Sequence, residues 1–228
     1  IYNARWILDR AARDYPLRLD ADKLKEKSAF LYHSLQEIRA CENASKLLGL
    51  EGEAASVYFS VFDQLILRQK ESFFFKERNR RPPLDNVNAM LSFAYSLLAG
   101  MCGSALEAVG LDPYVGFFHT DRPGRISLAL DMMEELRGVM ADRFVLTMIN
   151  KRIIKKENFI QKENGAVILD DTGRKLFLSA WQERKQDIIK HPFLNEKIEW
   201  GMVPHAQAML LARYLRRDLD EYPPFLWK

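Results

Sequence analysis

The stretch NVNAMLSFAYSLLAGMCGSAL, residues 86–106, contains no charged side chain. Its length is close to that of a membrane-spanning helix. Asn, Ser and Gly residues interrupt it, however, and its flanks, Arg80-Arg81 before it and Glu107 after it, do not form an anchoring pattern. We therefore interpret this stretch as the buried central helix of a soluble protein, against which the rest of the chain packs.

Helical periodicity dominates the chain on both sides of this central stretch. Pro82-Pro83 ends a polar, Arg-rich loop just before it. Apolar residues three and four apart predict helices over residues 3–14 and 20–40, and from near Glu51 through Ile66. After the central stretch, further helices are expected from Ser127 to about Ile154, from Asp171 to about Lys190, and from about Pro204 to Arg217.

A single strand signal lies in residues 158–169. Phe159-Ile160 and Val167-Ile168-Leu169 flank Asn164-Gly165, a dipeptide favoured in tight hairpin turns. The sequence therefore predicts a mainly α fold, a multi-helix domain with one small β-hairpin near residues 158–169.

The composition excludes several classes of protein. Of the 228 residues, 48% are hydrophobic and 29% charged, which is enough to bury a core and excludes a disordered chain. Two cysteines cannot cross-link a domain of this size, and no secretory leader opens the chain, so we expect a cytoplasmic protein. The net charge of +3 is too small to indicate nucleic-acid binding by itself.

Acidic and imidazole groups gather near the start of the helix expected at Ser127. Asp131 and Glu134 are three residues apart, so they share one helix face, and His119 lies just upstream. Such groups can bind a divalent metal that acts on phosphate oxygens. A hydrogen-bonded structural histidine and a solvated pair of carboxylates are equally compatible with this spacing. The pattern alone leaves metal-binding, acid–base and structural roles open.

Basic residues flank the same region and supply candidate contacts to DNA phosphates. Arginines beside the acidic cluster could bind a phosphate backbone in a bidentate manner. The cations at the end of the long helix also favour the helix dipole, and solubility remains an alternative role for all of them. The candidates are Arg78, Arg80, Arg81, Arg122, Arg125, Lys151 and Arg152.

Four motif blocks, in this order, resemble those of the CRISPR adaptation integrases, the Cas-one (Cas1) family. The details are most similar to members from type I-C systems. The blocks are Leu50-Glu51-Gly52 with Ala54-Ala55 and Tyr58-Phe59; Arg81-Pro82-Pro83-Leu84-Asp85 with Asn88-Ala89; Gly110-Leu111-Asp112-Pro113-Tyr114 with Gly116 and His119; and Ser127 to Asp131 with Glu134.

The resemblance implies a set of metal ligands and a reaction. Glu51, His119 and Glu134 match the catalytic residues that bind Mg²⁺ or Mn²⁺ in this family, and Asp131 is expected as an accessory metal ligand. The implied activity is that of a metal-dependent DNA integrase and endonuclease of CRISPR spacer acquisition. An enzyme with this activity is expected to join the 3′-hydroxyl of short foreign DNA to the CRISPR repeat by transesterification.

The resemblance also implies a domain arrangement and partners. Residues 1–228 correspond to the helical catalytic domain, and we expect the β-rich N-terminal domain of the family to be absent from this chain. The expected partners are foreign DNA fragments and the CRISPR repeat, the Cas-two protein (Cas2) and, in some subtypes, a Cas-four nuclease (Cas4). The full-length family forms homodimers, and no membrane partner is expected.

Two other interpretations remain. The chain could be a catalytically silent DNA-binding or scaffold fragment that needs its missing domain and partners, or an unrelated all-α interaction protein. The apolar segment 223–227 also has two possible roles, covering the apolar face of a nearby helix or docking a partner.

Overall fold

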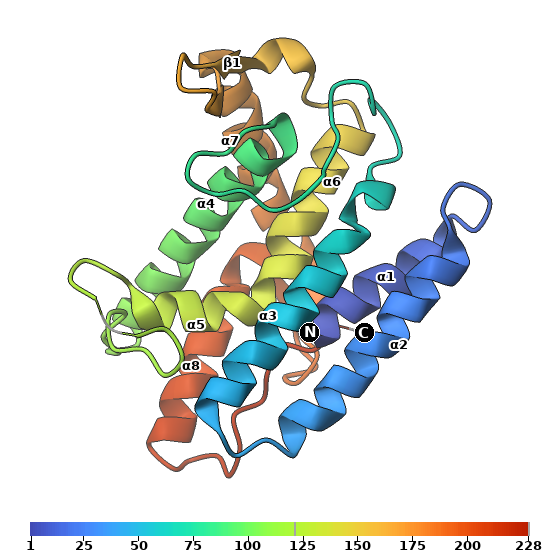
Figure 1. The fold of residues 1–228 in the computed structure, drawn as a ribbon. Helices are drawn as coiled ribbons and strands as arrows, with labels where there is room; N and C mark the ends of the chain where they lie inside the picture. The colour runs from blue at the N-terminus through green and yellow to red at the C-terminus, as the bar shows by residue number, and fades with distance from the viewer. Residues whose placement is uncertain (121, 228) are drawn as a thin grey trace.

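The computed structural model describes residues 1–120 and 122–227, and it has a mainly helical fold (Figure 1). The fold class predicted from the sequence is confirmed. The α-helices are α1 (Tyr2–Asp14), α2 (Ala21–Arg39), α3 (Ala44–Ser60), α4 (Asn86–Ala108), α5 (Ser127–Leu136), α6 (Arg143–Asn150), α7 (Asp171–Lys185) and α8 (Val203–Leu215). Short 3₁₀ segments span Phe62–Leu65, Lys156–Asn158 and Trp200–Met202.

Helix α4 is the central element, as its uncharged sequence predicts. Asp85 caps it by accepting a hydrogen bond from the Asn88 amide at 2.7 Å. Leu91, Leu98 and Cys102 are fully buried, and α4 packs against α5, α6, α8 and a strand at residues 167–169. Length and composition would allow α4 to cross a membrane, but more than half of its apolar stretch is buried inside the fold. This is the environment of a core helix.

Helices α1 and α2 follow the predicted ranges, but α3 does not. It begins after Asn43, whose side chain accepts from the Lys46 amide at 3.0 Å, and it ends at Ser60. The prediction of a start near Glu51 and an end at Ile66 was wrong. Gly49 and Gly52 suggested a helix start, but both lie inside α3, where the cap at Asn43 and tertiary packing offset the helix cost of glycine.

The long helix predicted from Ser127 to Ile154 is three segments. Between α5 and α6, residues Arg137–Asp142 form a π-helical segment, and α6 ends at Asn150. Asn3 of α1 donates from Nδ2 to the backbone carbonyl of Glu135 at 2.6 Å, just before the helix changes. A hydrogen bond from the side chain of another helix to a helix carbonyl disturbs the i→i−4 pattern of backbone hydrogen bonds. Gly138 allows this approach, because a Cβ there would lie 3.2 Å from Ile7 Cδ1.

The predicted hairpin is confirmed, and a second strand pair accompanies it. Strands β1 (Phe159–Gln161) and β2 (Val167–Leu169) pair antiparallel around Gly165, whose φ is +80°. Strands β3 (Ile188–Lys190) and β4 (Lys197–Glu199) also pair antiparallel. Helix α7 therefore ends at Lys185, and the prediction that it reaches Lys190 was wrong. The backbone of residues 188–190 bonds to a strand beyond a turn instead of continuing the helix.

The first and last described segments of the chain lie close together (Figure 1). The rings of Trp6 and Trp227 pack edge to face with their centroids 6.0 Å apart, and Phe225 is fully buried. The apolar segment 223–227 therefore covers the interior of the fold, one of the two roles that its composition allowed.

Candidate active site

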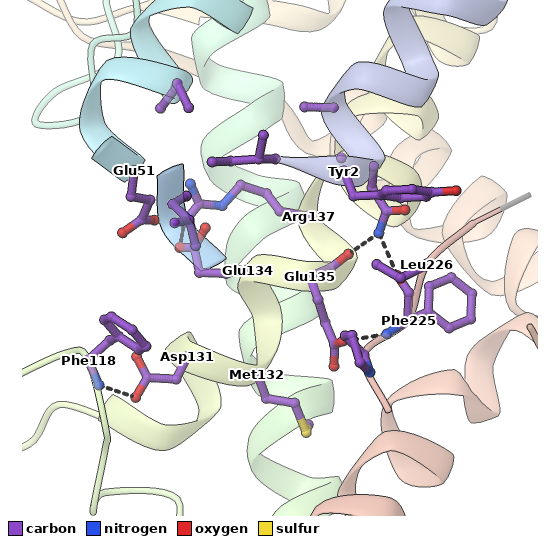
Figure 2. Close-up of a pocket in the computed structure, with 18 of the residues that line it drawn as sticks. Tyr2, Glu51, Phe118, Asp131, Met132, Glu134, Glu135, Arg137, Phe225 and Leu226 are labelled. Carbon is purple, nitrogen blue, oxygen red and sulfur yellow. Dashed lines mark hydrogen bonds and ion pairs between the residues drawn. The ribbon is translucent and has the colours of Figure 1, made fainter. Parts of the chain in front are cut away.

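A cavity of about 510 Å³ opens between α1, α3, α5 and the chain segment 222–226. Glu51 of α3, His119 of the loop before α5, and Asp131 and Glu134 of α5 all line it. The structure thus brings all four predicted metal-site residues, from three separate segments of the chain, to one cavity. Figure 2 shows three of them, Glu51, Asp131 and Glu134.

Asp131 anchors the loop that carries His119. Its carboxylate accepts hydrogen bonds from the backbone amides of Phe117 at 2.6 Å, Phe118 at 2.9 Å and His119 at 3.0 Å. These three hydrogen bonds fix the loop to α5. Gly116 is required for this close approach, because a Cβ there would lie 2.7 Å from the Cβ of Ser127.

The same carboxylate orients the His119 ring. His119 Nδ1 lies 2.6 Å from Asp131 Oδ1, and the side chain of Asp131 is only 9% exposed. Since a carboxylate accepts, Nδ1 carries the proton in this pair, and Nε2 is the ring nitrogen left for another ligand. The structure therefore places His119 directly beside Asp131.

Glu134 and Glu51 reach the cavity from opposite sides. Figure 2 shows Glu134 on the side of α5 that faces Glu51, with Arg137 beside it. Glu134 forms an ion pair with Arg137, one helical turn further along. The Arg137 guanidinium also lies over the Tyr95 ring, 5.1 Å from its centroid. Arg137 is therefore the cation that balances Glu134 in this structure.

The donor set fits a divalent cation, although it is not closed around one point. Within residues 1–120 and 122–227, no three His, Cys, Asp or Glu side chains are close enough together to hold a metal ion. The side chains of Glu51, Glu134 and His119 nevertheless share one cavity and supply oxygen and imidazole donors. A metal bound to Glu134 would displace Arg137 from its ion pair and leave that guanidinium without a carboxylate partner.

The basic residues divide into two groups. Arg78 turns inward: it donates to Asn88 Oδ1 at 2.7 Å and to Ser92 Oγ at 3.0 Å, and it lies over the Tyr95 ring. Its guanidinium fastens the loop before α4 to that helix, so it is not displayed to a ligand as the sequence suggested. Arg125 is half-buried, and the exposed candidates are Arg80, Arg81, Arg122, Lys151 and Arg152.

The sequence analysis missed several residues of the cavity wall. Asp142, at the end of the π-helical segment, is buried and accepts from the Tyr95 hydroxyl at 2.6 Å. Burial raises the pKa of the Asp142 carboxyl to about 6. Its signal in the sequence is a carboxylate in the otherwise apolar stretch from Val139 to Val145, in which Arg143 is the only other charged residue. Arg137 could have been found by its spacing from Glu134.

Comparisons of sequence identify relatives over the whole chain. A family model described as CRISPR associated protein Cas1 matches residues 1–183. CRISPR-associated endonuclease Cas1 1 of Chlorobaculum tepidum is 50% identical over 228 residues, covering 100% of this chain and 66% of the relative. CRISPR-associated endonuclease Cas1 2 of Rhodospirillum rubrum is 53% identical over 232 residues, covering 100% and 67%. The chain spans about two thirds of the length of these relatives.

Solved structures share the fold. A casposase bound to its integration product superposes with a TM-score of 0.83 at 26% identity, over 100% of this chain and 61% of the other. A chain of a Cas6-RT-Cas1–Cas2 complex has a TM-score of 0.75 over 100% of this chain and 24% of its own length, and at 24% identity it shows the fold alone. A Cas4/Cas1 fusion of Geobacter sulfurreducens is 38% identical over 233 residues, covering 97% of this chain and 42% of the fusion.

Proposed function

The chain belongs to the CRISPR-associated Cas1 family, and from that premise we propose that it is a divalent-metal-dependent DNA integrase and endonuclease of CRISPR spacer acquisition. The 3′-hydroxyl of a short foreign DNA attacks a phosphodiester at the edge of a CRISPR repeat. A new P–O bond forms as the old one breaks, and the proton of the hydroxyl passes to the 3′-oxygen that leaves. The observation that carries this proposal is the single cavity shared by Glu51, His119, Asp131 and Glu134.

Glu51, His119 and Glu134 are the proposed ligands of Mg²⁺ or Mn²⁺. When bound, such an ion lowers the pKa of the attacking hydroxyl and stabilises charge on the phosphate oxygens. The hydrogen bonds of Asp131 favour a different role from the accessory ligation predicted for it. They fit a residue that supports His119, because its oxygens are already used by the loop amides and by Nδ1.

The remaining residues of the chain bind and orient DNA. Asp131 holds the His119 ring with Nε2 available, and Arg137, once separated from Glu134, offers a cation to a phosphate within the same cavity. The exposed Arg80, Arg81, Arg122, Lys151 and Arg152 and the half-buried Arg125 contribute phosphate contacts that position the duplex without reading its sequence. With water in place of the 3′-hydroxyl, the same arrangement nicks DNA.

A catalytically silent DNA-binding or scaffold role is the second candidate. Two observations favour it: the chain spans about two thirds of its relatives, and its donors do not close around one point within the part that the structure describes. In that case a segment corresponding to the remaining third of these relatives would complete the centre.

The deciding experiment is a nicking assay on supercoiled DNA with Mn²⁺ or with EDTA. We expect cleavage by the wild-type chain in Mn²⁺ only, and none by Glu51→Ala. Glu53→Ala is the matched control, because Glu53 lies in the same helix but is exposed and outside the cavity wall. DNA binding without nicking by the wild type would favour the silent role. Equal nicking by the wild type and Glu51→Ala would reject the ligand assignment.

Family membership supports a proposal for the partners and the location of the protein. We propose that the chain works in the cytoplasm with Cas2, and as a homodimer in its full-length form. The Cas4/Cas1 fusion among its relatives supports Cas4 as a further partner. Co-purification of tagged Cas2 and Cas4 with the chain tests both.

A further inference from the structure

The neighbouring glutamates of α5 point in different directions. Adjacent residues of a helix are about 100° apart around its axis. Figure 2 shows Glu134 on the side toward Glu51 and Glu135 on the side toward Phe225 and Leu226. Because both residues belong to the same helix, the contacts of the Glu135 carboxylate influence the position of the Glu134 carboxylate.

Glu135 binds three donors from the C-terminal part of the chain. Its Oε1 accepts from Gln207 Nε2 at 3.0 Å and from the Tyr222 hydroxyl, and its Oε2 accepts from the Phe225 amide at 2.6 Å. The donors come from α8 and from segment 222–225. Both carboxylate oxygens are thus used to hold this segment against α5.

Asn3 closes the arrangement from the opposite end of the sequence. Its Nδ2 donates to the Glu135 carbonyl at 2.6 Å and to the Phe225 carbonyl at 2.7 Å, and its Oδ1 accepts from the Trp227 amide at 2.9 Å. Helix α1, helix α5 and segment 222–227 are joined through two side chains. We call this set, Asn3, Glu135, Gln207, Tyr222 and Phe225, the α5 clamp.

The clamp and the cavity share a wall. Asn3, Glu135, Tyr222 and Phe225 all line the cavity that contains Glu51 and Glu134. The carbonyl held by Asn3 is that of Glu135, and the π-helical segment that carries Arg137 begins two residues later. A rotation of α5 would move Asp131, Glu134 and Arg137 together.

We propose that Glu135 is a positioning residue for the reaction at this cavity, and that it acts by fixing the rotation of α5 through the clamp. This inference rests on the proposed function. Both oxygens of Glu135 are bound by protein donors, so its role is to set where Glu134 and Asp131 stand. A misplacement of about 1 Å can reduce an enzymatic rate about 100-fold, so a loosened clamp is expected to slow chemistry with little effect on DNA affinity.

The test compares Glu135→Ala and Glu135→Gln with Phe177→Leu, which weakens the core between α4, α6 and α7 and leaves the clamp unchanged. Single-turnover nicking at saturating DNA, with Mn²⁺ and well below each Tm, is expected to fall at least 10-fold in Glu135→Ala. It is expected to fall less in Glu135→Gln, which keeps one oxygen acceptor, and not at all in Phe177→Leu. The Kd for DNA stays within about 2-fold throughout.

A second measurement keeps the inference testable without activity. Amide hydrogen exchange of residues 131–142 is expected to accelerate at least 10-fold in Glu135→Ala and to remain unchanged in Phe177→Leu, in which residues 171–185 exchange faster instead. Unchanged exchange at 131–142 in Glu135→Ala overturns the clamp. A wild-type rate of nicking in this variant, together with faster exchange, overturns its positioning role. A wild type that does not nick refutes the proposed function, while hydrogen exchange still decides whether the clamp exists.

Discussion

The segment formed by α5 and the π-helix holds its carboxylates in two different ways. We call the side of Glu134, toward Glu51, the cavity side, and the side of Glu135 and Asp142 the buried side, although both residues also border the cavity. On the cavity side, Glu134 has one charged partner, Arg137, on the same helical segment. On the buried side, neutral donors bind the carboxylates: Tyr95 binds Asp142, while Tyr222, Gln207 and a backbone amide bind Glu135. Burial raises the pKa of both buried carboxyls.

This difference separates two kinds of acidic residue within one short stretch of chain. An ion pair at the edge of a cavity can exchange one cation for another, since its net strength is modest in contact with water. A buried carboxylate cannot lose a donor without leaving a polar group unsatisfied. The cavity side is therefore suited to binding, and the buried side to holding the structure.

The largest expected effect is on the cavity side. His119→Ala removes the imidazole but leaves the Asp131–amide contacts of the loop, so metal-dependent nicking is expected to fall at least about 100-fold with an unchanged helical CD spectrum. His33→Ala on the exposed face of α2 is the control. A fully active His119→Ala chain would remove His119 from the proposed metal site.

The buried side is expected to respond in stability. Phe225 is fully buried between Trp200, Trp227 and His191. Phe225→Ala is expected to lower the free energy of unfolding by about 3–5 kcal/mol, measured by urea denaturation. Phe117→Ala provides the contrast, because Phe117 is 66% exposed, and its cost is expected to stay within about 0.5 kcal/mol. Equal losses in the two variants would show that segment 223–227 does not contribute to the core.

Asp142 gives the buried side a pH dependence. Because its folded pKa is raised, the folded state holds the proton more tightly than the unfolded state, and stability falls as pH rises from about 4 through about 6. The shift corresponds to about 3 kcal/mol. Asp142→Asn is always neutral and retains an oxygen that can accept from Tyr95. The stability of the wild type relative to Asp142→Asn should therefore decrease by about 2 kcal/mol between pH 4 and pH 7, because the unfolded carboxyl is already partly ionised at pH 4. Urea melts at both pH values measure it. Parallel pH profiles for the two proteins would contradict the raised pKa.

The smallest effect concerns charges outside the cavity. Replacing Arg122 and Arg125 by Ala should flatten the dependence of log Kd on log salt by roughly two units, because each arginine that no longer neutralises a phosphate removes about one unit. Arg13→Ala combined with Lys25→Ala removes two exposed cations from α1 and α2 as a control. If the double variant at 122 and 125 keeps the wild-type slope, these arginines do not bind DNA.

The sequence predicted those parts of the fold that local signals determine. The uncharged stretch 86–106 became the core helix, Asn164-Gly165 became the hairpin turn, and the spacing of Asp131 and Glu134 placed both on the cavity. In each case one short-range rule decides the outcome: burial of an apolar run, a positive φ at glycine, or helical periodicity.

The parts that were missed depend on contacts between distant segments. Strand β3 exists because Ile189 pairs with Ile198 beyond a turn in which Asn195 adopts a φ of +58°. The π-helical segment accompanies the bond from Asn3 to the Glu135 carbonyl, more than a hundred residues away in sequence. Arg78 looked like a surface cation because its acceptors, the buried Asn88 and the half-buried Ser92, lie on a helix that follows it, and its own position does not reveal them. No local pattern encodes these pairings.

The hydrogen bonds between Asn3 and segment 222–227 also determine at which stage of protein synthesis the cavity can be completed. The ribosome produces chain at about 5–20 residues per second, and early segments fold first. Helices α1 to α7 can be complete while residues 222–227 are still inside the ribosomal exit tunnel. Helix α5 then lacks the bonds from Tyr222 and Phe225, and Asn3 lacks its bonds to Phe225 and Trp227. The wall of the cavity that segment 222–226 forms is therefore completed only after these residues have been translated. A product that terminated before residue 222 would contain Glu51, His119, Asp131 and Glu134, but its cavity would lack this wall.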